Sequence, residues 1–240
     1  MTKKSLDRFF IYLGTIIIGI IILVHSPLFE IQEINILGNS VVTDSQILNV
    51  VDTSTNMISF SRNSSRNSLL RNPYIESVVI KKDFINREIT IEIVERVTIG
   101  YIQFTQDQFL YIDKYGRVLE VNSFFTRPLP IVVGLTFSEF VLGEILEIAN
   151  EDAFSVVTIL AYLFDKYDIE QDIVRVDISD SSNIRFYYGQ IGINIGTVED
   201  IDQKVRIVQA ILPELTPMKT IGGNLDIRSI HRPWVFQLLT

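Results

Sequence analysis

The residue types that most often carry chemistry in proteins are scarce in this chain of 240 residues. The sequence contains no cysteine and two histidines, His25 and His231. The lack of cysteine excludes disulfide bonds, thiolate metal sites and cysteine nucleophiles. With so few histidines, zinc sites that need several of them and Ser-His-Asp triads are also poorly supported.

Two groups of carboxylates could in principle supply a general acid and a general base. The first is Asp113 with Glu120, and the second contains Glu199, Asp200 and Asp202. Helix starts and solvated faces explain these carboxylates more simply, because acidic side chains are favourable at the positive end of a helix dipole. We therefore predict no catalytic residues and no metal site, and a protein that is not an enzyme.

The glycines of the C-terminal half do not form a nucleotide-binding motif. Gly189, Gly192 and Gly196 are three and four residues apart, whereas a dinucleotide fold needs the spacing Gly-x-Gly-x-x-Gly. Glycines in hairpin turns are the simpler interpretation. We predict no cofactor and no small-molecule substrate.

The remaining candidate for function is a strand near the C-terminus that could bind another protein. Its residues alternate between polar and apolar and come last among the predicted strands: Asn224, Leu225, Asp226, Ile227, Arg228, Ser229 and Ile230. A strand at a sheet edge has unpaired backbone N–H and C=O groups, which accept a strand from a partner. A position in the middle of the sheet is the alternative. Trp234, the single tryptophan, either covers the end of this strand or contacts the partner.

The composition provides enough apolar material for a folded core. Hydrophobic residues make up 47% of the chain and charged residues 21%, which excludes a largely disordered protein. The formal net charge is −8 at pH 7. Nucleic acid is therefore a poor candidate partner, because an acidic protein repels the phosphate backbone.

The N-terminal residues are typical of a membrane anchor. A basic head at 1–8, with Lys3, Lys4 and Arg8, precedes an uncharged, Ile-rich stretch from Phe9 to Val24. An apolar segment over 9–28 is long enough for a single transmembrane helix. The positive residues place the N-terminus in the cytoplasm and the bulk of the chain outside. A cleaved secretory signal is the alternative, although the residues after Val24 lack the small-residue pattern of a cleavage site.

The rest of the chain is predicted to be α+β and to form two units, at 29–97 and 98–240. In the first unit, alternation predicts strands at 29–36, 77–82 and 88–95, with two short helices between the first two strands. Thr43 and Gln46 have the spacing of a capping box, which starts the first helix, and Pro73 ends the second. The second unit is predicted to contain helices after Asn150 and near Asp200, with strands at 101–104, 109–113, 117–121, 173–178, 183–188, 192–195 and 224–230.

The ordered set of motifs resembles the FtsQ/DivIB family of bacterial cell-division proteins. The first unit is similar to a POTRA domain, with the order strand, helix, helix, strand, strand. The second is similar to the mixed α/β domain of that family, called the β domain. The residues that carry the resemblance are Phe29-Glu30-Ile31, Gly38-Asn39-Ser40, Asn72-Pro73-Tyr74, Ile89-x-Ile91-x-Ile93-x-Glu95-Arg96, Tyr111-Ile112-Asp113 and Leu225-Asp226-Ile227-Arg228.

This resemblance implies a single-pass scaffold of the division machinery at the septum. The family's partners are coiled-coil membrane proteins, FtsL with FtsB or DivIC, together with other division proteins of the membrane. In the family, the last strand of the β domain pairs with a strand of the partner. By position, this last strand corresponds to Asn224–Ile230 in the present sequence. Two alternatives stay open: another POTRA-containing protein of envelope assembly, acting as a chaperone, and a membrane-anchored cell-wall hydrolase.

Overall fold

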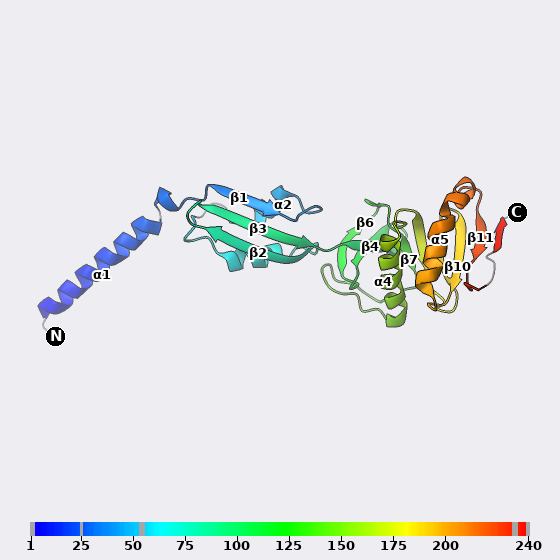
Figure 1. Cartoon of the computed structure of the whole chain (residues 1–240). Helices are drawn as coiled ribbons and strands as arrows, with labels where there is room; N and C mark the ends of the chain where they lie inside the picture. Colours follow the sequence, from blue (N-terminus) through cyan, green and yellow to red (C-terminus); the bar gives the residue numbers. More distant parts are fainter. Residues whose placement is uncertain (1–2, 25, 53–55, 232–234, 239–240) are drawn as a thin grey trace. The chain divides into compact units, whose positions relative to one another are not determined.

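The computed structural model describes residues 3–24, 26–52, 56–231 and 235–238 (Figure 1). The chain divides into two compact units, Met1–Arg96 and Val97–Thr240. Each unit has a hydrophobic core of its own, so each is described separately.

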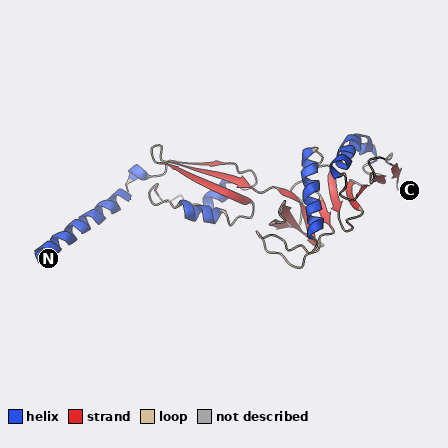
Figure 2. Cartoon of the chain, turned by 60° about the horizontal axis from the view of Figure 1, so that its bottom comes forward, coloured by secondary structure: helices blue, strands red, loops and turns tan. Residues whose placement is uncertain are grey.

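The first unit has the predicted order of strand, helix, helix, strand and strand. Its elements are α1 (Lys3–Val24), the 3-10 turn η1 (Pro27–Phe29), β1 (Glu33–Leu37), α2 (Asp44–Val50), α3 (Arg62–Leu69), β2 (Ile75–Asp83) and β3 (Glu88–Glu95). The sheet order is β1-β3-β2, with β3 parallel to β1 and antiparallel to β2. Helices α2 and α3 cover one face of this sheet (Figure 2).

Local sequence signals explain these elements well. Thr43 and Gln46 form the predicted capping box, in which the Gln46 amide donates to Thr43 Oγ1 and the Thr43 amide donates to Gln46 Oε1. The alternation in β3 places Ile89, Ile91 and Ile93 in the core under the helices. Burial of such side chains is the main source of stability, at about 25 cal/mol per Å² of apolar surface.

Helix α1 forms over the predicted N-terminal segment. Within the part of the chain that the structure describes, no helix combines the length and the apolar character needed to cross a bilayer. The transmembrane helix is therefore still a prediction.

The second unit is a nine-stranded sheet with two helices on one face (Figure 1). The sheet order is β12-β11-β10-β9-β8-β7-β4-β5-β6. Its elements are β4 (Thr98–Thr105), β5 (Gln108–Asp113), β6 (Val118–Asn122), β7 (Ile131–Val133), α4 (Glu151–Lys166), β8 (Ile173–Asp177), β9 (Ile184–Tyr188), β10 (Ile191–Gly196), α5 (Ile201–Leu215), the 3-10 turn η2 (Thr216–Met218), β11 (Gly223–Asp226) and β12 (Val235–Leu238).

Two buried tyrosines fix the loop that follows β6. The Tyr101 hydroxyl donates to the Arg127 carbonyl (2.8 Å) and accepts from the Arg127 amide (3.2 Å). The Tyr111 hydroxyl donates to the Phe124 carbonyl (2.6 Å) and accepts from the Thr126 amide (3.2 Å). Each hydroxyl thus satisfies both a donor and an acceptor of the loop backbone.

Replacing Tyr101 with phenylalanine is expected to lower the free energy of unfolding by about 1–3 kcal/mol, because two loop backbone groups lose their partner. Exposed Tyr115 is the control, and its replacement by phenylalanine should leave stability unchanged. The pKa of Tyr101 is raised above its ordinary value of 10.0. The largest cause is burial of the hydroxyl, and the second is the neighbouring Tyr111. The contribution of Tyr101 is therefore complete below pH 10 and is lost as the pH rises through the folded-state pKa. Chemical unfolding at a series of pH values measures both effects, and equal stability of the two variants would contradict the assignment.

Candidate functional site

The candidate site is the end of the second sheet formed by β10, β11 and β12. Strand β11 pairs with β10 in parallel and with β12 in antiparallel orientation. The prediction that residues 224–230 form an edge strand is therefore wrong. The strand covers Gly223–Asp226 alone, and β12 covers its outer side. Among the described strands, β12 is at the end of the sheet order (Figure 1).

The residues predicted to bind a partner have different environments. The side chains of Leu225 and Ile227 are buried in the core and are not available to a partner. Asp226 and Ile230 are half-buried, whereas Asn224, Arg228 and Ser229 are exposed. Trp234 lies outside the described residues.

The backbone of β12 presents hydrogen-bonding groups to the outside. The Ile227 amide donates to the Asn194 carbonyl of β10 (2.8 Å). Because amide directions alternate along a strand, the amides of Asn224 and Asp226 face β12. Their register partners are Gln237 and Val235, so the N–H and C=O groups of Phe236 and Leu238 face away from the sheet.

One side chain holds β12 against the core. Phe236 packs on the buried cluster under α5, while Val235 and Leu238 are about half exposed. Gly223, at the start of β11, makes room for the Phe236 ring, since a Cβ there would lie 2.5 Å from Phe236 Cζ. The outer strand is thus attached through one aromatic ring and a short ladder, and its outer edge is free of described strands.

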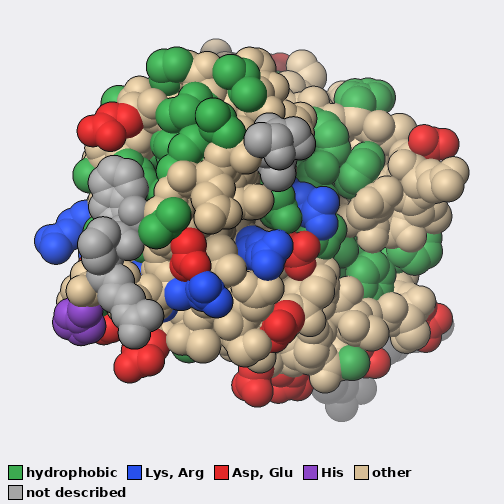
Figure 3. Space-filling view, turned by 90° about the vertical axis from the view of Figure 1, so that its right-hand side faces the viewer, with side chains coloured by type: hydrophobic (Ala, Val, Ile, Leu, Met, Phe, Trp, Pro, Cys, Tyr) green, Lys and Arg blue, Asp and Glu red, His purple; other side chains and the backbone are tan. Residues whose placement is uncertain are grey.

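Polar residues surround this edge on the sheet face opposite α5. A hollow of about 360 Å³ is lined by Arg185, Asn194, Asn224 and Gln237, among others. Asp226 accepts from Arg228 Nε and Nη2 beside it, and these bonds lower the pKa of the Asp226 carboxyl. The face in Figure 3 shows acidic and basic side chains close together below a group of hydrophobic ones. Such a surface offers both hydrogen-bonding and apolar contacts to a protein partner.

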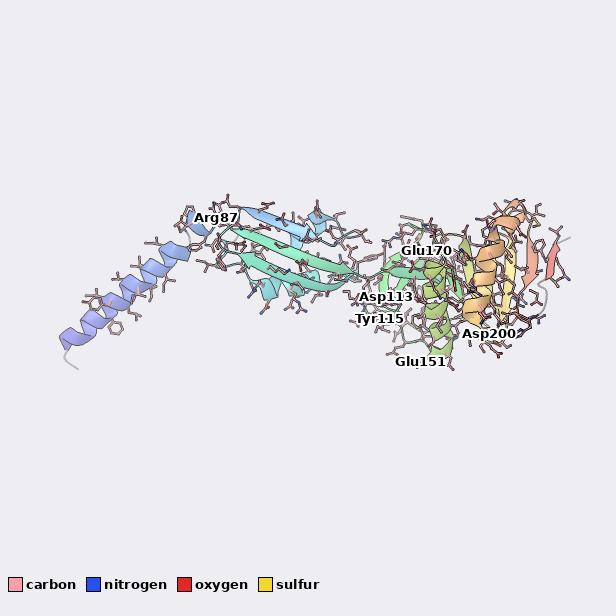
Figure 4. All side chains as sticks on the ribbon, in the orientation of Figure 1. Arg87, Asp113, Tyr115, Glu151, Glu170 and Asp200 are labelled. Atoms are coloured by element: carbon pink, nitrogen blue, oxygen red, sulfur yellow. The ribbon has the colours of Figure 1, made fainter. Side chains whose placement is uncertain are left out.

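The carboxylates considered for catalysis form hydrogen bonds within the fold or lie at the start of a helix. Asp113 is buried at the end of β5, where its Oδ1 accepts from the amides of Tyr115 (2.8 Å) and Arg117 (2.9 Å) and closes the hairpin (Figure 4). Asp202 accepts from Lys166 Nζ (2.5 Å), and Asp200 lies at the start of α5. Across residues 3–24, 26–52, 56–231 and 235–238, no group of three or more acidic or histidine side chains could hold a metal ion.

Comparisons with known proteins agree on one family. A domain described as "POTRA domain, FtsQ-type" matches residues 29–96, and one described as "FtsQ/DivIB, C-terminal related" matches residues 101–224. The chain is 30% identical to "Cell division protein DivIB" of Clostridium tetani over 218 residues, which cover 88% of this chain and 80% of that protein. It is 27% identical to the protein of the same name from Clostridium botulinum strain Hall (93% and 87% covered) and 25% identical to that of Bacillus cytotoxicus (94% and 86%).

Proposed function

Since the chain belongs to the FtsQ/DivIB family of cell division proteins, we propose that it is a membrane-anchored scaffold of the division machinery at the septum. In this proposal the partners are FtsL-type proteins and FtsB- or DivIC-type proteins, which contribute a strand to the outer edge of β12. Along the chain, the POTRA unit, residues 29–97, follows the anchor, and the β domain, residues 98–240, comes last.

The observation that carries the proposal is the position of β12 at the end of the sheet. Phe236 and Leu238 supply outward backbone groups, and each hydrogen bond to a partner strand is worth about 0.5–1.5 kcal/mol net. A four-residue strand therefore gives modest affinity by itself. Anchoring both proteins in one membrane raises their effective concentration, so that modest affinity suffices.

The anchor is the second part of the proposal. The uncharged run from Phe9 to Val24, preceded by Lys3, Lys4 and Arg8, supports a single-pass helix over 9–28 with the cytoplasmic head at 1–8. Residues 29–240 then lie outside the cytoplasm.

The anchor is tested by placing charges in its centre. Replacing Ile17 and Ile20 together with lysine is expected to release the chain from alkali-washed membranes, because each lysine opposes insertion by about 2.5–3.5 kcal/mol. Lysine at Ile145, which is exposed in the second unit, is the control and should leave the chain in the membrane fraction. Retention of the double variant in washed membranes would contradict an anchor at 9–28.

A further inference from the structure

Three loops of the first unit meet at one end of its sheet. They are residues 26–30, 56–60 and 82–87, and we call their common surface the loop end. The Met57 amide donates to the Phe29 carbonyl (2.7 Å), and Lys82 Nζ donates to the carbonyls of Met57 (2.8 Å) and Phe60 (2.6 Å). The Gln32 amide donates to the Arg87 carbonyl (2.9 Å). These bonds join the three loops into one surface.

The loop end carries three large apolar side chains that are exposed to solvent. Ile85 is 93% exposed, Leu28 72% and Phe84 53%. The turn that displays Ile85 is held by Asp83, whose carboxylate accepts from the amides of Ile85 (2.9 Å) and Asn86 (3.0 Å). Ile85 therefore buries almost none of its apolar surface within its own chain, and together with Leu28 and Phe84 it forms a group of exposed apolar side chains, which is typical of an interaction surface.

Three cationic side chains lie near these exposed apolar side chains. Lys82 Nζ lies 5.9 Å from the Phe84 ring centre, and Arg87 Nη1 donates to the Pro27 carbonyl (3.4 Å). Figure 4 labels Arg87 where β2 turns into β3. Arg62 is exposed at the start of α3, close enough to Lys82 to lower the pKa of its ammonium group after the larger effect of burial.

Carboxylates are also present at the same end, and two of them are hydrogen-bonded within the protein. Asp83 is used by the turn, and Glu88 Oε1 accepts from Asn35 Nδ2 (2.7 Å). Glu30 and Glu33 are exposed at this end, and Glu33 lies opposite Glu88 in the register of β1 and β3. Exposed apolar tips beside arginine side chains favour the boundary between lipid headgroups and acyl chains.

The chain itself brings this surface close to a bilayer. Helix α1 ends at Val24, and Leu28 follows four residues later. Four residues span at most about 14 Å when fully extended. If 9–28 is the anchor, Leu28 lies at its outer end, and the loops bonded to residues 26–30 start next to the interfacial layer.

We infer that the loop end is a lipid-binding surface, in which Leu28, Phe84 and Ile85 enter the headgroup region while Arg62 and Arg87 contact lipid phosphates. This inference rests on the proposed membrane anchor. It assigns the surface of the POTRA unit that faces the membrane, and so leaves the opposite end of its sheet free for other proteins.

The test uses the whole chain in vesicles of phosphatidylglycerol and phosphatidylcholine. Because the sequence has no cysteine, a single cysteine introduced as Ile85→Cys or Val94→Cys takes an environment-sensitive fluorophore at one site. Val94 is 55% exposed and lies near the other end of β3, which makes it the matched control. We expect blue-shifted emission at position 85 and several-fold stronger quenching there by nitroxide-bearing lipids than at position 94.

The outcomes separate the inference from the proposed function. A chain that does not float with the vesicles overturns the anchor and, with it, this inference. A chain that floats but shows equal quenching at both positions overturns the lipid-binding surface alone. Shielding of position 85 in native membranes but not in pure lipid vesicles would also overturn it and assign the surface to a protein partner.

The role of the arginines is tested separately with Arg62→Gln and Arg87→Gln. Each replacement is expected to lower the ratio of inserted to free loop end by roughly fivefold in phosphatidylglycerol vesicles, and to have little effect in pure phosphatidylcholine. Arg206→Gln, an exposed arginine of the second unit, is the charge-matched control. Equal quenching in all variants would contradict the role of the arginines.

Discussion

Replacing Leu225 with proline is expected to unfold the second unit, and not merely to weaken partner binding. The Leu225 side chain is fully buried, and β11 is paired on both sides. By alternation the Leu225 amide faces β10, and proline removes it from the ladder, which leaves a buried carbonyl without its partner at a cost of about 1–3 kcal/mol. Loss of the leucine side chain adds about 2–5 kcal/mol. The total is comparable with the whole stability of many domains.

Thermal unfolding followed by circular dichroism, with limited proteolysis, measures this effect. Leu225→Ala is the control, because it removes the packing but keeps the amide in the ladder. We expect the alanine variant to fold with a lowered melting temperature and the proline variant to be cleaved throughout residues 97–240. A proline variant that melts like the unchanged chain would contradict the interior position of β11.

The sequence predicts the first unit better than the second, because the patterns that define the helices and strands of the first unit are local. The capping box at Thr43 and the isoleucine alternation of β3 each act within a few residues, and both are present in the structure. Strands β7 and β12 have three and four residues, too few to display a period of two. Ile131–Val133 nevertheless joins β4 to β8 in parallel, which depends on residues far apart in the sequence.

The candidate site shows the same limit. The alternation correctly indicates a strand here, β11 at Gly223–Asp226, with Leu225 in the core, but it cannot tell whether another strand lies outside it. Coverage by β12 depends on the return of the chain after Ile230 and on the fit of Phe236 beside Gly223. No local pattern indicates such a contact, so the sequence alone places the edge of the sheet at β11 instead of β12.

Replacing Leu238 with proline is expected to reduce recovery of the coiled-coil partners from membranes by roughly tenfold or more. The outward amide of Leu238 is lost, and the proline ring obstructs the approach of a partner strand, together about 1.5–3 kcal/mol. Leu238 is half exposed, so the fold itself should be little affected. Co-purification of the whole chain from detergent-solubilised membranes measures recovery.

Two controls make this result interpretable. Leu238→Ala removes the side chain but keeps the amide, and it should retain the partners. An unchanged melting temperature of the proline variant shows that the second unit remains folded. Full partner recovery with a folded proline variant would show that the partners do not use the edge of β12.

The proposed scaffold role depends most on a partner strand lying against β12, and cysteine cross-linking in membranes tests this directly. The chain has no cysteine of its own, so Leu238→Cys provides a single reactive site at the edge. Ile159, which is exposed on α4, provides the control as Ile159→Cys. With cysteines placed one by one along the extracytoplasmic segment of the FtsB- or DivIC-type partner, we expect disulfides to position 238 at alternate partner residues. Cross-links at position 159 and none at position 238 would contradict strand addition at this edge.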